Sequence, residues 1–133
     1  MYYSLSGGAK PEGMFGNPVR AHHLFRSIDL EHWEYMHPFV EDDRVTSIGD
    51  NGHCPYFWPI GDRHMLLFFS SMSGGQYLFG DYDTVRDKFV VAGGGKFNHG
   101  ATHPSVVHAP SASPDGQGGL IAIFNMKIGR AHV

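Results

Sequence analysis

Two stretches of this chain follow the same pattern about 55 residues apart. Residues 53–59 (HCPYFWP) are echoed by residues 108–114 (HAPSASP), and each leads through a Gly/Asp turn into an apolar run. A second pair, residues 24–29 (LFRSID) and 78–83 (LFGDYD), repeats at nearly the same spacing. A repeat of this length made of short strands is typical of β-propeller blades, which are four-stranded sheets around a channel.

The length of the chain limits how many such units it can hold. Propellers use about 4–8 blades, whereas the 133 residues accommodate only about two complete repeats. We therefore predict an all-β fold, a partial β-propeller of about two four-stranded antiparallel blades. Residues 1–127 are expected to be a fragment of one propeller domain, with units at roughly 20–52, 53–91 and 106–127. An all-β sandwich also has short strands at such spacing, but the nearly constant offset favours the propeller.

Composition and chain ends narrow the class of protein. The net charge is −3 without a basic stripe, which predicts no nucleic-acid or membrane partner. Cys54 is the single cysteine, so it forms no internal disulfide and leaves the compartment open. Residues 1–5 resemble a strand more than a secretory leader. Residues 128–133 (IGRAHV) match the translation of a common sequencing adapter, so we interpret them as an artefact outside the fold.

Short apolar runs between turn residues predict a succession of strands. Residues 41–52 and 93–103 are expected to be loops, and Trp33 is expected in the core. The apolar runs at 65–69 and 120–124 lack alternation, which predicts strands buried on both faces. The expected strands cover residues 2–5, 22–27, 33–36, 55–58, 64–70, 76–82, 88–91, 106–109 and 119–124.

The best candidate site is the loop-to-strand junction at residues 50–55 (DNGHCP). By the repeat, His53 and His108 hold equivalent positions in neighbouring blades and would face one funnel; the alternative is that these residues only shape a turn. Alternation along the strand then predicts that Phe57 also faces the funnel, while Tyr56 and Trp58 pack between blades. An exposed Phe57 ring would be a platform for a sugar, and packing between blades is its alternative role.

The ten histidines do not predict a metal site. His99, His103 and His108 lie close in sequence, but no cysteine or carboxylate stands at ligand spacing. We therefore expect neither a metal nor another cofactor.

The residues also resemble a known family, glycoside hydrolase family 32. The resemblance is carried by residues 54–62 (CPYFWPIGD), 66–70 (LLFFS) and 77–83 (YLFGDYD), with 24–33 similar to the family's blade-ending pattern. Residues 108–110 fall where the family usually has Tyr-Ala-Pro. In all, the resemblance spans about residues 20–126. It implies a five-bladed propeller that hydrolyses β-fructosides such as sucrose, levan and inulin.

The family uses a nucleophilic Asp from the first blade and a proton-donating Glu, close together. That Glu normally stands directly before the cysteine that matches Cys54, where this chain has His53. A histidine can act as a general acid near neutral pH, and Asp50 could instead supply the missing carboxyl. His53 and Asp50 are therefore the catalytic candidates, and Phe57, His108 and Cys54 are expected to contact the substrate.

Two motifs of the family do not occur in this sequence. The nucleophile's Asn-Asp-Pro-Asn and the sugar-binding Arg-Asp-Pro are both missing, so we expect the fragment alone to be inactive. Its expected partners are a carbohydrate substrate and the remaining blades of the parent. Two alternatives stay open: an arabinoside-cleaving propeller and a sugar-binding propeller without catalysis. Related proteins are often secreted or periplasmic, but the localisation of this one is left open.

Overall fold

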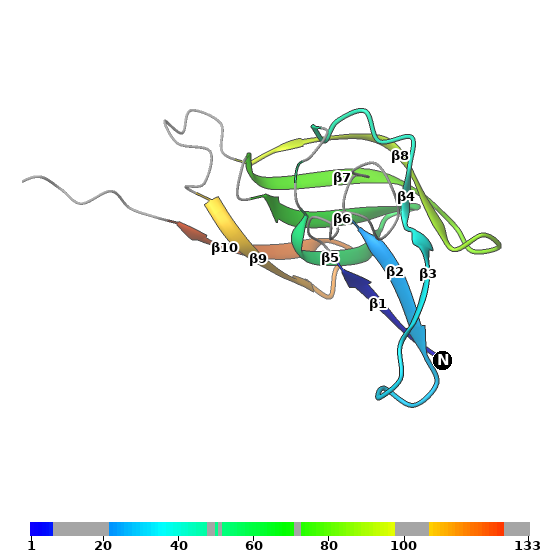
Figure 1. Cartoon of the computed structure of the whole chain (residues 1–133). Coiled ribbons are helices and arrows are strands. Elements are labelled where there is room, and N and C mark those ends of the chain that lie inside the picture. Colours follow the sequence, from blue (N-terminus) through cyan, green and yellow to red (C-terminus); the bar gives the residue numbers. More distant parts are fainter. Residues whose placement is uncertain (7–21, 48–49, 51, 71–72, 98–106, 127–133) are drawn as a thin grey trace, which may run out of the picture.

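The structure is a computed structural model that describes residues 1–6, 22–47, 50, 52–70, 73–97 and 107–126. These residues form ten β-strands in three sheets (Figure 1), which confirms the all-β prediction. They contain no helix, and so none that is long and apolar enough to cross a membrane. The predicted artefact at 128–133 lies outside the described residues. The strands are β1 (Tyr2–Ser6), β2 (His23–Ser27), β3 (Glu34–Pro38), β4 (Val40–Glu41), β5 (His53–Ile60), β6 (Arg63–Ser70), β7 (Gly74–Asp83), β8 (Lys88–Lys96), β9 (Val107–Pro114) and β10 (Leu120–Met126).

The central sheet is built from consecutive hairpins. Successive strands from β5 to β8 pair antiparallel in three hairpins, which confirms the predicted meander. The short β4 adds to β8 in parallel, so the expectation of a loop from residue 41 is wrong at Glu41. β8 also continues to Lys96, so the expectation of a loop from residue 93 is wrong. The glycines there serve close packing: a Cβ on Gly94 would lie 2.3 Å from the carbonyl oxygen of Tyr77.

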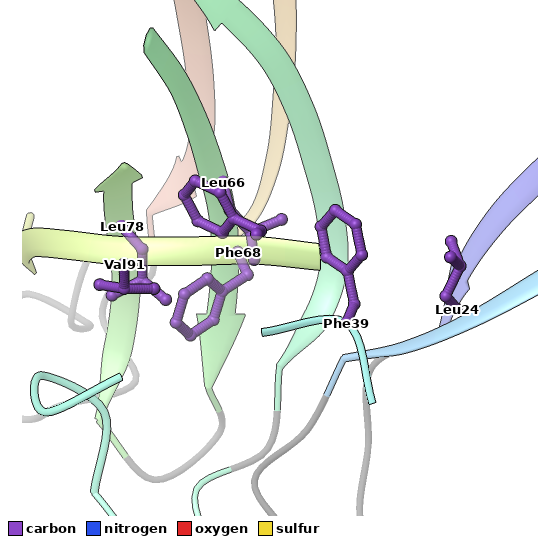
Figure 2. Packing of buried hydrophobic residues seen from close by; sticks show 7 residues of the cluster. Leu24, Phe39, Leu66, Phe68, Leu78 and Val91 are labelled. Atoms are coloured by element: carbon purple, nitrogen blue, oxygen red, sulfur yellow. The ribbon is translucent and has the colours of Figure 1, made fainter. Parts of the chain in front are cut away.

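The three sheets are stacked in chain order. The antiparallel β1–β2–β3 sheet packs on one face of the central sheet through an apolar cluster, and Figure 2 shows Phe39 between Leu24 and the residues of β6. On the other face, β9 of the β9–β10 hairpin lies against β5, β6 and β7. Leu66, Leu67 and Phe68 of β6 are fully buried, as expected for a strand covered on both faces.

The same β-bulge occurs in β5, at the edge of the central sheet, and in β9 of the β9–β10 sheet. In β5 the pairing with β6 shifts between His53 and Tyr56, and β9 shows the same shift against β10 after His108. The next residue in each strand, Cys54 or Ala109, has a left-handed backbone with φ of 51° and 49° respectively. Because this conformation is uncommon outside glycine, its recurrence at matching positions supports the repeat seen in the sequence.

The β2–β3 and β7–β8 hairpins also match, but one residue away from the sequence alignment. The pairing shifts between Leu24 and Phe25 in β2, and between Phe79 and Gly80 in β7. These bulges align Leu24 with Phe79, whereas the sequence pattern aligned it with Leu78. Leu24 and Leu78 belong to the same apolar cluster, which they enter from different sheets. The sequence alignment is therefore one residue off at the bulges, but it holds at the turns, where Asp29 and Asp83 accept hydrogen bonds from equivalent backbone N–H groups.

Two burial predictions are wrong. Trp33 was expected in the core, but it follows the β2–β3 turn and is 41% exposed. The run at 120–124 was expected to be buried on both faces, yet Ile121 and Ile123 of β10 are exposed. The reason is that no described strand covers the outward face of β10.

Candidate functional site

The candidate site is formed by the first residues of β5 and the loop before them. His53 opens the strand, is half-buried and pairs with Phe69 of β6, the two ring centroids lying 6.1 Å apart. Cys54 follows in the bulge and is exposed. Bulges redirect side chains and are common beside active sites. Here the bulge interrupts the alternation of β5 directly after His53.

Phe57 points into the apolar cluster between the first and central sheets. It pairs with Leu66, and its ring centroid lies 5.0 Å from that of Phe39 and 5.1 Å from that of Phe89. The expectation that Phe57 faces the funnel with His53 is therefore wrong. The bulge changes the alternation, and neighbouring sheets cover both faces of the central sheet.

Beside Phe57 lies a cavity of about 320 Å³ between the first and central sheets. The hydroxyl of Tyr82 at its wall donates a 2.7 Å hydrogen bond to Asp87, and burial, followed by that bond, raises the pKa of Tyr82. The lining is otherwise mostly apolar and suits an apolar group better than a sugar. The expected contact between Phe57 and the substrate stays a prediction. The lining residues are Tyr3, Leu5, Leu24, Phe39, Pro55, Phe57 and Tyr82.

Asp50 is the centre of a buried hydrogen-bond cluster. Its side chain accepts hydrogen bonds from the Ser70 hydroxyl, from the Ser73 hydroxyl at 2.5 Å and from Gln76 Nε2 at 3.2 Å. Asp50 is 4% exposed, and Ser70 and Gln76 are fully buried. A buried carboxylate is costly unless it is hydrogen-bonded, so these donors tie the loop before β5 to the β6–β7 hairpin.

This arrangement bears on the two catalytic candidates. Both carboxylate oxygens of Asp50 are engaged and enclosed, so proton exchange with a substrate would require the cluster to open. Asp50 is therefore better placed to hold the loop before His53 than to exchange a proton with a substrate. The catalytic assignment of each residue stays a prediction.

His22 holds the same loop from the first sheet. Its ring is buried, with its centroid 4.7 Å from that of Phe68, and its backbone is left-handed with φ of 90°. A Cβ on Gly52 would lie 2.2 Å from His22 Nε2, so any other residue directly before His53 would displace the buried His22 ring. Strained backbone of this kind is concentrated at functional sites.

The backbones of His53 and His108 lie at the same end of the stack. His53 pairs with Phe69, and Phe69 pairs with Gly75 of β7. A Cβ on Gly75 would lie 3.1 Å from Val107, the residue before His108. The His108 side chain is outside the described part, so its expected direction toward a shared funnel stays a prediction.

Sequence reasoning missed His22, Ser70, Ser73 and Gln76. Each contacts Asp50 or Gly52 across a long separation in sequence, which no local pattern reveals. One signal was available: Ser70 and Gln76 are polar residues that adjoin the apolar runs of β6 and β7, and buried polar side chains need hydrogen-bond partners.

The site combines one accessible imidazole with a rigid, hydrogen-bonded support. An imidazole can give or take a proton near neutral pH. In the described part of the chain, no group of three or more His, Cys, Asp or Glu side chains could hold a metal ion, and His99 and His103 lie outside that part. No protein-family model, curated protein or solved structure matches this chain.

Proposed function

We propose that this chain is part of a five-bladed propeller glycosidase similar to glycoside hydrolase family 32. The whole protein would hydrolyse β-fructosidic bonds of the sucrose, levan or inulin type. In this proposal the three stacked sheets belong to consecutive blades, and β5 and β9 line the central channel. The remaining blades supply the nucleophile and close the ring.

The observation that carries the proposal is the bulge shared by β5 and β9. Blades related by rotation present equivalent residues to one axis. Cys54 and Ala109 share a left-handed backbone, and the strands that contain them start at the same end of the stack. His53 and His108 would therefore approach one channel mouth, where a sugar binds.

The outward face of the third sheet supports the proposal that further blades are partners. By the strand pairing, Ile123 of β10 corresponds to Leu67 of β6, because Ser111 pairs with Ile123 as Tyr56 pairs with Leu67. Leu67 is fully buried beneath β9, whereas Ile123 is 68% exposed and Ile121 is 59% exposed. A following blade, packed as β9 packs on the central sheet, would cover both isoleucines.

A retaining mechanism gives His53 a defined role. As the nucleophilic Asp of another blade attacks the anomeric carbon, the His53 imidazolium donates its proton to the departing oxygen. The neutral imidazole then takes a proton from the water that releases fructose from the covalent intermediate. Cys54 and His108 would contact the bound sugar, and Asp50 is the alternative proton donor.

A second candidate function is sugar binding without hydrolysis. The Asp50 cluster favours it, because this nearby carboxyl is enclosed and fully hydrogen-bonded while His53 stands where the family has Glu. Such a protein would keep the channel and lose turnover.

The test uses the longer protein that contains this chain. Release of fructose from sucrose, levan and inulin is measured beside release of arabinose from arabino-oligosaccharides, for the wild type and for His53→Ala and His53→Glu. We expect fructose release, lowered by about 10²–10⁴-fold in His53→Ala and unchanged in the control His37→Ala. Arabinose release, or saccharide binding without turnover, would replace the proposal with the corresponding alternative. An unchanged rate in His53→Ala would remove its acid role.

A further inference from the structure

A second hollow lies at the opposite end of the first sheet from His53. β2 begins at His23, next to the His22 ring that touches Gly52, and it ends at Ser27. The β2–β3 turn beyond Ser27 forms a hollow of about 420 Å³. Its lining includes Arg26, Ile28, Trp33 and Glu34, and it does not involve the candidate site described above.

The turn that shapes this hollow is held by one carboxylate. Asp29 accepts hydrogen bonds from the backbone N–H groups of Glu31 and His32 at 2.9 and 2.8 Å. The Ser27 hydroxyl donates to the same oxygen at 3.0 Å, and the other oxygen lies 2.9 Å from His32 Nδ1. These hydrogen bonds, with the His32 backbone first, hold the pKa of Asp29 well below its usual range. The hollow is therefore preformed, as ligand sites usually are.

Trp33 gives the hollow an aromatic surface in a fixed orientation. Its indole Nε1 donates a 3.1 Å hydrogen bond to the carbonyl oxygen of Leu30, while 41% of the residue remains exposed. The polar edge of the ring is thus satisfied within the turn. What the residue offers to a ligand is apolar aromatic surface.

Beside Trp33, an ion pair supplies a donor and an acceptor. Arg26 Nε and Nη2 both lie 2.8 Å from the same carboxylate oxygen of Glu34. This geometry leaves Arg26 Nη1 and Glu34 Oε1 outside the ion pair, on two oppositely charged residues that both line the hollow. Two neighbouring hydroxyl groups fit such a pair, because one can accept from the guanidinium and the other can donate to the carboxylate.

We propose that this hollow binds a neutral saccharide, whose ring stacks on Trp33 and whose neighbouring hydroxyls bind Arg26 and Glu34. The β7–β8 turn provides a natural comparison within the molecule. Asp83 caps it in the same way, accepting from the N–H groups of Val85 and Arg86, but the turn carries no aromatic residue. This second binding site does not depend on hydrolysis at His53.

The test titrates the full 133-residue chain with sucrose to about 100 mM, well above a millimolar Kd, and follows the indole N–H of Trp33 and Nε–H of Arg26 by NMR. We expect saturable shifts of both signals. Trp33→Ala and Arg26→Lys, which loses the planar fork but keeps the charge, should each weaken binding at least about tenfold. Val85→Ala and His53→Ala should leave it unchanged.

Several results would overturn the proposal. One is the absence of a saturable Trp33 shift in the folded wild type, and another is undiminished binding by a folded Arg26→Lys variant. Tighter binding of glucuronate than of sucrose would show that the site prefers anions. Loss of the Trp33 shift in His53→Ala would mean that the saccharide binds at the candidate site around His53 and not at the hollow. Failure of hydrolysis in the longer protein would count against the proposed function alone, because binding at the Trp33 hollow does not depend on hydrolysis.

Discussion

The β5–β6 and β9–β10 hairpins share one construction and differ in what covers them. Both open with a bulge around a left-handed residue, Cys54 or Ala109. Leu67 on β6 is fully buried, while its counterpart Ile123 on β10 is 68% exposed. The difference lies in the neighbouring strand, because β9 covers β6 and no described strand covers β10. Local sequence therefore determines the hairpin, and the stack determines how much stability its apolar residues contribute.

The largest expected effect comes from truncating these two apolar counterparts. Leu67→Ala should lower the free energy of unfolding by about 3 kcal/mol, from lost burial and a residual cavity. Ile123→Ala should change it by less than about 0.5 kcal/mol, because most of its side chain already contacts water. Urea denaturation of the two variants measures the difference. Equal losses would mean that β10 is covered in solution.

The second-largest expected effect comes from removing the carboxylates of Asp50 and Asp115, which lie next to the β5–β6 and β9–β10 hairpins. Asp50→Ala should cost about 2 kcal/mol, because it leaves buried donors of Ser70 and Gln76 without their acceptor. Asp115→Ala should cost clearly less, since that exposed carboxylate only accepts from the backbone N–H groups of Gln117 and Gly119 in the β9–β10 turn. Thermal unfolding at neutral pH ranks the two variants. The reverse order would show that the Asp50 cluster does not hold the loop.

A smaller effect tests whether the two bulges are equivalent. Cys54→Gly and Ala109→Gly should each raise stability by about 0.5 kcal/mol. Glycine removes the cost of the left-handed backbone in the folded state, and this gain exceeds the destabilisation from the greater entropy of the unfolded chain. Chemical denaturation of both variants gives the comparison, with Cys54→Ser as a control that keeps the strain. Stability changes of opposite sign at positions 54 and 109 would show that the two bulges are not equivalent.

The smallest effect concerns acid stability at the β2–β3 and β7–β8 turns. The pKa of Asp29 is lowered mainly by the backbone hydrogen bond from His32, and that of Asp83 mainly by the side chain of Arg86. The resulting stabilisation is complete above about pH 4, the pKa of an unfolded Asp, and is lost as pH falls toward the folded pKa. Asp29→Asn and Asp83→Asn should each flatten the decline of the unfolding temperature below about pH 4. An unchanged decline in both variants would contradict these assignments.

Much of the fold could be predicted from order and composition. Apolar runs separated by Gly/Asp turns predicted the β5–β8 meander, because hairpin pairing is local in sequence. The bulges were not predictable: those of β2 and β7 lie one residue away from the sequence alignment, which the Asp29 and Asp83 turns keep. The bulge of β5 places Phe57 in the core. The exposure of Trp33 and Ile123 depends on which sheets lie nearby, which no local pattern contains.

The candidate site was predictable only in its centre. The junction around His53 stood out because it recurs at His108. The support around it was not visible, since Ser70 and Gln76 reach Asp50 through pairing between distant strands. Their one trace in the sequence is a polar residue next to an apolar run.

The most direct test of the stacked repeat is a distance between its two bulges. Cys54 is the single cysteine of the chain, so Ala109→Cys adds one matched site for a pair of spin labels. Adjacent sheets pack on the order of 10 Å apart. We therefore predict a 54–109 distance well below the distance between labels at 109 and 85 in a Cys54→Ser, Val85→Cys background. A 54–109 distance equal to or longer than this control would contradict the account.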